Sequence, residues 1–252
     1  MKYNGFYLVG NYPDEETFLQ AATIGLHYFD FMEVGLPFSD PIADGPVLAS
    51  ASHKALQNGA TTDNVLKNIT KIKDYIINNN CNKKIYIMTY ANKVYHTTID
   101  RTIALFADSG VDGIILADVP YKESARFKQY TDSYHLDYIH FITPESTHTQ
   151  IQQVCADAKG FIYAISMRGT TGNTLTLDNT IIDILQLAKQ YAKIPVVLGF
   201  GIQNNHDVQQ ALHYADGFII GTALEKKLEE GLDAYKQFIY QLHIQDKTKN
   251  IS

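Results

Sequence analysis

The stretch FDFMEVGLPFSDPIADGP, residues 29–46, joins an almost wholly apolar run to a segment of acids, glycines and prolines. Because side chains alternate along a β-strand, Phe31, Glu33 and Gly35 are predicted to share one face, which would point into the lumen of a barrel. Barrel enzymes place their active sites at the carboxyl ends of their parallel strands. The stretch therefore predicts an inward-facing strand that ends at a working site.

The same order of elements recurs along the rest of the chain. Short apolar runs alternate with longer segments of helical period, which is the pattern of βαβ units around a parallel sheet. The length of 252 residues matches the roughly 250 residues typical of a (β/α)8 barrel. We therefore predict an α/β TIM (β/α)8 barrel that forms a single domain over residues 1–252. Its predicted strands are residues 6–9, 29–34, 85–88, 113–116, 138–141, 161–165, 195–198 and 217–220.

The helical segments between these strands carry their own end signals. Asp14 and Thr147 precede helical segments as predicted N-caps, and Gly25 and Gly110 follow such segments as predicted C′ residues. The predicted helices are residues 15–24, 64–77, 99–109, 123–133, 148–157, 181–192 and 207–214, with residues 225–242 closing the chain.

The composition limits the classes of function. Hydrophobic residues make up 45% of the chain and charged residues 19%, as in ordinary globular proteins. The formal net charge of −6 argues against a general affinity for nucleic acid or anionic membranes, which depends on clustered Lys and Arg. No secretory signal is recognisable at the start, and no apolar run approaches the roughly 20 residues that span a bilayer. We therefore predict a cytoplasmic protein with no nucleic-acid or membrane partner.

The cysteines Cys81 and Cys155 have neither metal-ligand spacing nor a disulfide-rich context. Free cysteines are among the most buried residue types in proteins. We predict that both are reduced, buried and structural, and that the chain has no metal site.

Two acids in the opening stretch are the candidate working carboxylates. Glu33, near the end of its strand, would rise into the mouth of the barrel, where partial desolvation raises a pKa toward values useful in acid–base catalysis. Asp44 is presented by a loop that prolines stiffen. Each acid also has a plain structural explanation, because a Glu at a strand end commonly faces solvent and an Asp-Gly step forms turns.

Glycine-bearing loops follow the last three predicted strands: RGTTG at 168–172, GFG at 199–201 and GTA at 221–223. Barrel enzymes commonly bind phosphate with backbone N–H groups of such loops and a short helix. We therefore predict an anion site that needs no clustered Lys or Arg, although a single G-x-G after a strand is equally consistent with a tight turn. Its predicted binding residues are Gly172, Gly201, Gly221 and Thr222.

The stretch MEVGLPFSDPIADGP, residues 32–46, resembles the signature of the tryptophan synthase alpha family and matches it at every fixed position. The similarity covers nearly the whole chain. It continues in register through MTYANKVY at 88–95, GVDGIILADVP at 110–120, YAISMRGTTG at 163–172, LGFGI at 198–202 and IIGTA at 219–223.

This resemblance implies a retro-aldol cleavage of indole-3-glycerol phosphate to indole and glyceraldehyde 3-phosphate. It implies that Glu33 protonates the indole ring at C3 and handles the proton of the glycerol hydroxyl, and that Asp44 accepts the indole N–H. Tyr163 matches a pocket residue near the glycerol chain, although an inward-facing Tyr could equally fill the barrel. Residues 167–177 match a loop that closes over substrate, in which Thr171 helps to position the second carboxylate.

The resemblance also implies a partner, because members of the family work as an αββα assembly that passes indole to a β subunit. Pyridoxal phosphate is expected only in that β subunit, and no cofactor is expected in this chain. The segments 40–52, 90–95 and 122–126 would face the partner.

The chain departs from the family pattern in a few places. Asn11 stands where Ala or Gly is usual, and Met167 and Arg168 alter the start of the closing loop. The chain also begins almost at its first predicted strand, which leaves the closure of the barrel floor open.

Two other functions remain possible at this stage. One is a non-catalytic subunit that only activates a β subunit, whose signature would be the loss of Glu33 or Asp44. The other is a different sugar-phosphate barrel enzyme, which would share the phosphate loops but lack the PFSDPxADGP sequence.

Overall fold

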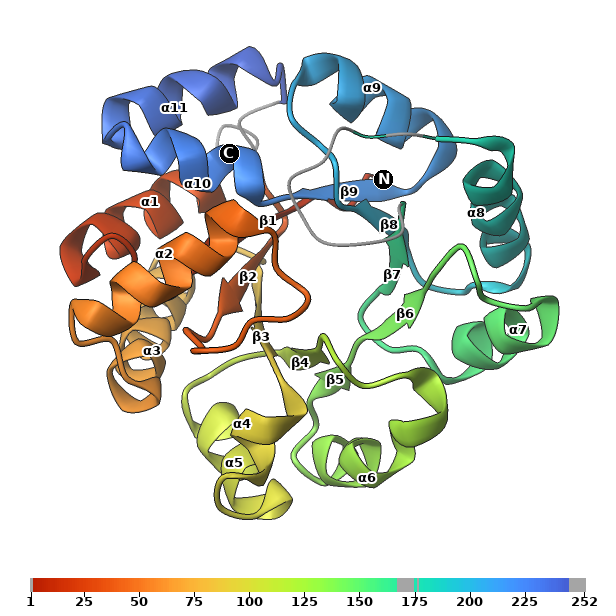
Figure 1. Ribbon diagram of the computed structural model, residues 1–252, viewed down its shortest axis with the longest axis horizontal. Helices are drawn as coiled ribbons and strands as arrows, with labels where there is room; N and C mark the ends of the chain where they lie inside the picture. Colours follow the sequence, from red (N-terminus) through yellow and green to blue (C-terminus); the bar gives the residue numbers. More distant parts are fainter. Residues whose placement is uncertain (1, 167–174, 176, 245–252) are drawn as a thin grey trace.

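Parallel strands wind into a barrel surrounded by helices (Figure 1). The computed structural model describes residues 2–166, 175 and 177–244. Within them the strands follow the order β5-β4-β3-β2-β1-β9-β8-β7-β6, and neighbouring strands pair in parallel. The predicted TIM barrel is confirmed. The strands are β1 (Gly5–Val9), β2 (Phe31–Gly35), β3 (Lys84–Thr89), β4 (Gly113–Leu116), β5 (Asp137–Tyr138), β6 (His140–Ile142), β7 (Ile162–Ile165), β8 (Val196–Gly199) and β9 (Gly217–Ile220).

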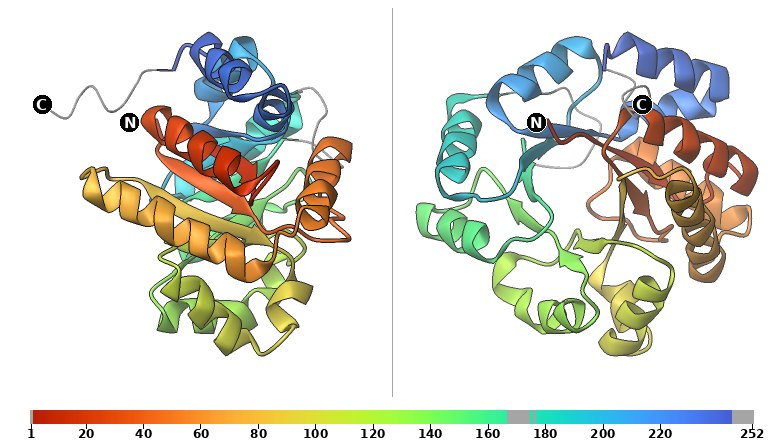
Figure 2. Two further views of the ribbon diagram at one scale, coloured as in Figure 1. Left: turned by 90° about the vertical axis from the view of Figure 1, so that its left-hand side faces the viewer. Right: turned by 180° about the vertical axis from the view of Figure 1, so that it is seen from behind.

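Helices form the outer layer, and both ends of the barrel can be followed in Figures 1 and 2. They are α1 (Glu15–Tyr28), α2 (Pro46–Gln57), α3 (Thr62–Asn78), α4 (Ala91–Tyr95), α5 (Ile99–Asp108), α6 (Ala125–Ser133), α7 (His148–Asp157), α8 (Asn179–Tyr191), α9 (Asn205–Tyr214), α10 (Thr222–Glu229) and α11 (Leu232–Gln241), with a 3-10 turn η1 (Tyr121–Glu123).

Alternate residues of each strand face two different layers. Leu8 and Val34 pack in the layer between strands and helices, whereas Tyr7 and Phe31 belong to a second cluster inside the barrel. Since Glu33 has the same parity as Phe31, its side chain lies on the inner face. The predicted inward face of β2 is therefore confirmed.

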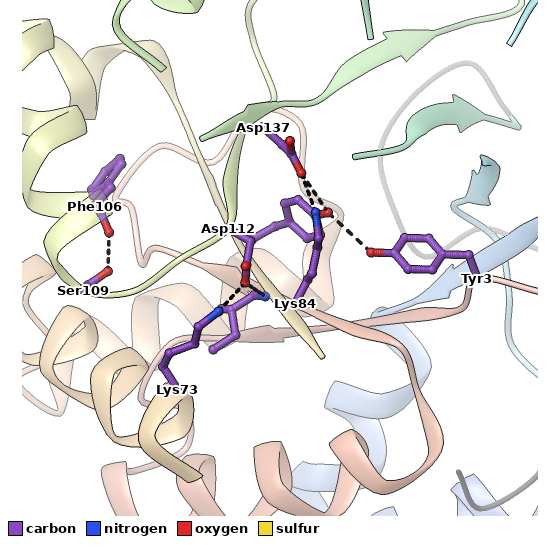
Figure 3. Close-up of polar contacts among 9 residues, drawn as sticks. Tyr3, Lys73, Lys84, Phe106, Ser109, Asp112 and Asp137 are labelled. Carbon is purple, nitrogen blue, oxygen red and sulfur yellow. Dashed lines mark hydrogen bonds and ion pairs between the residues drawn. The ribbon is translucent and has the colours of Figure 1, made fainter. Parts of the chain in front are cut away.

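Aromatic rings fill the amino-terminal end of the barrel. The ring centroids of Tyr3 and Phe31 lie 4.7 Å apart, and those of Phe31 and Phe161 lie 4.8 Å apart. Beside them the Tyr3 hydroxyl lies 3.4 Å from that of Tyr86, which lies 3.5 Å from a carboxylate oxygen of Asp137 (Figure 3). Side chains of the strands and of the segment before β1 thus close the floor that the family resemblance left open.

One of the predicted strands is divided into two strands, β5 and β6. Residues 138–141 were expected to form a single strand, but β5 pairs only with β4 and β6 pairs only with β7. Ile139, between them, still donates its N–H to the carbonyl of Ile114 at 3.0 Å. The strand is divided where the chain passes from one neighbour to the other.

The N-caps Asp14 and Thr147 are confirmed, because each side chain accepts a hydrogen bond from the backbone three residues on. Gly110 is also confirmed as a C′ residue, with φ of 88° after α5. Gly25 was predicted wrongly: α1 continues through it to Tyr28. A Cβ at Gly25 would lie 2.5 Å from the Phe6 ring, so this glycine permits close packing of α1 on β1.

Other helix predictions also differ from the structure. Residues 225–242 form two helices, because the chain turns at Gly231 with φ of 115°, a backbone conformation that glycine adopts most readily. Helices α2 and α4 were not predicted. Helix α2 begins at Pro46, directly after the loop that carries Asp44, with Pro in its first turn, where the missing N–H costs nothing.

Cys155 is buried and Cys81 is only partly buried, and both are free thiols. The predicted burial therefore holds for Cys155 alone. Among the helices in the described part of the chain, none combines the length and apolar character needed to cross a membrane.

Candidate active site

The carboxyl ends of the strands surround a cavity of about 220 Å³. Much of its wall is apolar and includes Leu48, Met88 and Phe141. Polar groups come from strands β1 and β7, which supply Tyr7 and Tyr163, and from the loops after β2, β8 and β9, which supply Asp44, Gly201, Gly221 and Thr222. Such a wall suits a flat aromatic group that carries a polar tail.

Glu33 is not among the described residues that line this cavity, but it pairs across the sheet with Tyr7, which does. Its side chain is fully buried, and neither carboxyl oxygen has a hydrogen-bond partner among the described residues. Burial raises the pKa of Glu33 well above its ordinary value, so the acid keeps its proton where an exposed glutamate would be ionised. No hydrogen bond to a residue that the structure describes fixes the rotamer of this carboxyl group.

Asp44 faces the cavity from the turn between β2 and α2. The Tyr90 hydroxyl donates to its Oδ2 at 3.3 Å and itself accepts the N–H of Ala43 at 3.2 Å. Burial raises the pKa of Asp44 to about 6, and the hydrogen bond from Tyr90 opposes that rise. The hydrogen bond from Tyr90 therefore favours the ionised form of Asp44, whereas unopposed burial favours the protonated form of Glu33.

Two tyrosines in the cavity wall lean over glycines of the neighbouring strand. The Tyr7 hydroxyl lies 2.0 Å from where a Cβ on Gly35 would stand, and the Tyr163 hydroxyl lies 2.5 Å from the same position on Gly199. Burial, with nearby carboxylates, raises the pKa of both phenols well above the ordinary value. Both therefore remain neutral hydrogen-bonding groups beside Glu33.

The opposite end of the cavity is built from backbone. Phe200 and Gly201 have φ of 73° and 80°, and this turn brings Gly201 to the cavity wall. Helix α10 begins at Thr222, and its N-cap Gly221 offers no side-chain hydrogen bond to the first turn. Free N–H groups and the positive end of a helix dipole together attract anions. Among the described residues no lysine or arginine lines this cavity.

The structure thus brings Asp44, Tyr163, Gly201, Gly221 and Thr222 together around one cavity, and Glu33 is the strand partner of Tyr7 in its wall. The remaining predicted binding residues, Thr171 and Gly172, and the departures Met167 and Arg168 lie outside the described residues.

Sequence reasoning missed Tyr7 and Tyr90 as site residues. Tyr7 could have been found from its inward parity on the first strand, and Tyr90 from its place directly after β3. Asn11 has φ of 59°, a conformation that Asn tolerates better than most residues. Its side chain also hydrogen-bonds to those of Asn64 and Asn68 on α3. No cluster of potential metal ligands occurs in the part of the chain that the structure describes.

Comparison with known proteins agrees with this geometry. A family model described as tryptophan synthase alpha chain matches residues 5–251. The tryptophan synthase alpha chain of Caldicellulosiruptor bescii is 34% identical over 236 residues, which cover 94% of this chain and 89% of that protein. A tryptophan synthase structure from Mycobacterium tuberculosis matches with a TM-score of 0.84 at 29% identity, over 96% of this chain and 91% of that chain. A structure of the tryptophan synthase α2β2 complex from Pyrococcus furiosus matches with a TM-score of 0.85 at 27% identity, over 96% and 99%.

Proposed function

The chain belongs to the tryptophan synthase alpha chain family, lyases of tryptophan biosynthesis, and we propose that it splits indole-3-glycerol phosphate into indole and glyceraldehyde 3-phosphate. The observation that carries this proposal is the placement of two carboxyl groups in unlike settings: Asp44 lines the cavity and accepts a hydrogen bond from Tyr90, whereas Glu33 is fully buried with no hydrogen-bond partner among the described residues. Two carboxyl groups in unlike settings can hold different protonation states, which acid–base cleavage requires.

At the indole end, Glu33 turns into the cavity and gives its proton to C3 of the ring. The positive charge that develops on the ring is stabilised by the Asp44 anion, which accepts the indole N–H. The Glu33 carboxylate then takes the proton of the glycerol hydroxyl. The carbon-carbon bond breaks and its electron pair returns to the ring, so that Glu33 ends the reaction protonated. Tyr163, in the wall beside Glu33, binds the glycerol chain.

At the other end, backbone N–H groups near Gly201, Gly221 and Thr222 hold the phosphate. Support comes from the uncapped first turn of α10 and from the absence of any Lys or Arg among the described residues that line the cavity. Thr171 and Gly172, from the segment outside the described residues, complete the site.

The partner in this proposal is a tryptophan synthase β subunit, in an αββα heterotetramer that receives the indole. The pyridoxal phosphate of the overall synthesis belongs to that subunit, and the chain itself works without a cofactor as one barrel domain over residues 1–252. The loop around exposed Ile42, next to the Asp44 turn, lies in the segment 40–52 expected to face the partner.

Purified chain incubated with indole-3-glycerol phosphate is expected to release indole and glyceraldehyde 3-phosphate in equal amounts, slowly alone and faster with β subunit, because assembly orders the loops around the site. Trapping the aldehyde with a coupled dehydrogenase measures the rate. Stimulation of the β subunit without any cleavage would instead indicate a purely activating subunit.

Substitution Gly201→Asp is expected to raise KM for indole-3-glycerol phosphate or abolish turnover without unfolding the barrel. Asp tolerates the left-handed conformation of this position, but it brings a negative charge to the proposed phosphate site. Gly201→Asn is the matched control, because it has the same size and no charge. Steady-state kinetics and circular dichroism would measure both effects, and near-normal kinetics in Gly201→Asp would count against the site.

A further inference from the structure

Glu225 is a buried acid that the proposed reaction does not use. It lies in the first turn of α10 and is 1% exposed. One carboxyl oxygen accepts the backbone N–H of Val9, and the other has no hydrogen-bond partner among the described residues. Burying a carboxyl group with one oxygen unpaired costs folding free energy.

The place of Val9 explains the hydrogen bond. Strand β9 pairs with β1 only as far as Phe6 and Ile220, whereas β1 pairs with β2 along its full length to Val9. The N–H of Gly10 turns to β2 and donates to Gly35 at 2.8 Å, so the N–H of Val9 points to the side where β9 has already ended. Glu225 supplies the acceptor that the missing strand residue would have offered.

After β9 ends at Ile220, the chain leaves the barrel and forms α10. Gly221 packs against the base of Tyr7, since a Cβ there would lie 3.1 Å from the Tyr7 Cβ. The glycine contact and the Glu225 hydrogen bond therefore both hold the first turn of α10 against β1, where Figure 1 shows α10 beside β1 and α2.

We propose that Glu225 is a positioning residue for the anion site: its carboxyl ties the first turn of α10 to the end of β1 and so holds the amides of that turn in place for a phosphate group. This inference rests on the proposed phosphate site. Side chains of a helix lean toward its amino terminus, so the Glu225 carboxyl lies toward the end of α10 that would receive the anion.

The protonation state of Glu225 makes the proposed anion binding depend on pH. Burial raises its pKa to about 8, while the Val9 hydrogen bond opposes the rise and Glu229 adds to it. Below that pH the group is neutral and does not repel a phosphate dianion, and above it a negative charge enters the first turn of α10. The groups that face it are Tyr7 from β1, Tyr12 from the following loop, Tyr235 from α11, Glu229 and Lys226 from α10 and Lys54 from α2.

The test compares Glu225→Gln with Glu225→Leu in the full chain. Gln keeps a neutral acceptor for Val9 at every pH, whereas Leu fills the same space without one. Isothermal titration with glycerol 3-phosphate is expected to show wild-type affinity at pH 7 for Gln and about tenfold weaker binding for Leu, the effect of one lost hydrogen bond. In kinetics with indole-3-glycerol phosphate, Leu raises KM and leaves kcat nearly unchanged.

Between pH 7 and pH 9 the wild type is expected to lose affinity for glycerol 3-phosphate, whereas Glu225→Gln is expected to keep it. The ligand changes little over this range, because its second ionisation, near pH 6, is largely complete at pH 7. This arm decides the question even if the Leu variant fails to fold. Wild-type affinity in a folded Leu variant, or the same decline with pH in wild type and Gln, would overturn the inference.

Gly201→Asp separates this inference from the proposed function. If Gly201→Asp binds glycerol 3-phosphate like the wild type, the anion site itself is misplaced and the proposed function loses its phosphate end. If Gly201→Asp loses binding while both Glu225 variants behave like the wild type at pH 7 and pH 9, only the role of Glu225 is refuted.

Discussion

Replacing Glu33 with glutamine is expected to slow the cleavage of indole-3-glycerol phosphate by about 10²–10⁴-fold, the usual contribution of a positioned acid–base group. The amide has the size of the neutral acid but no proton to give to the ring. The loss should appear in kcat, because the cavity wall that binds substrate is unchanged. Aldehyde trapping with saturating substrate measures it, and Glu16→Gln on the exposed face of α1 is the matched control.

The same substitution should not weaken the fold. A carboxyl whose folded pKa is raised costs stability as the pH rises above its unfolded value of about 4.3. Because the pKa of Glu33 is raised by burial alone, Glu33→Gln is expected to melt at or above the wild-type temperature at pH 7, with a smaller difference near pH 4. A fully folded variant that cleaves at the wild-type rate would rule out Glu33 as the acid.

The parts of the fold that the sequence predicted are those with a local physical cause. The apolar strands, the N-caps Asp14 and Thr147 and the glycine after α5 each depend on residues close together in the chain. Gly25 was misinterpreted because its role is set by the Phe6 ring, which packs on it from another element. The division of the strand at Ile139 depends likewise on two different neighbours, and no local pattern carries that information.

The same distinction between local and long-range causes applies to the residues of the site. The positions of Glu33 near the end of β2, and of Asp44 and the glycine loops after strand ends, could be predicted because the topology brings these strand ends together. Tyr90 was missed because its importance comes from one hydrogen bond to Asp44. Glu225 was missed because its neighbours Leu224 and Leu228 mark the buried face of α10. A pattern of apolar residues does not reveal that an acid among them is buried and accepts a hydrogen bond from the end of β1.

Replacing Asp44 with asparagine is expected to lower kcat by about 10²–10³-fold, the cost of removing one preorganised electrostatic group from a transition state. Asparagine retains an oxygen that can accept the indole N–H, but it lacks the negative charge that stabilises the cationic ring. Since the charge matters only after C3 is protonated, KM should change much less than kcat. Steady-state kinetics at pH 7.5 measure kcat and KM separately, and a rise in KM with unchanged kcat would assign Asp44 to ground-state binding.

The pH dependence of kcat tests the role of the Asp44 charge without a substitution at Asp44. Because the pKa of Asp44 is raised to about 6, protonation below that pH removes the anion, and wild-type kcat is expected to fall about tenfold for each pH unit on the acid side. Tyr90→Phe removes a hydrogen bond that favours the ionised form, so the midpoint of this fall should move to higher pH. Asp44→Asn has no group to titrate there and should show a flat residual rate. A fall with the same midpoint in all three proteins would mean that another group controls the acid side.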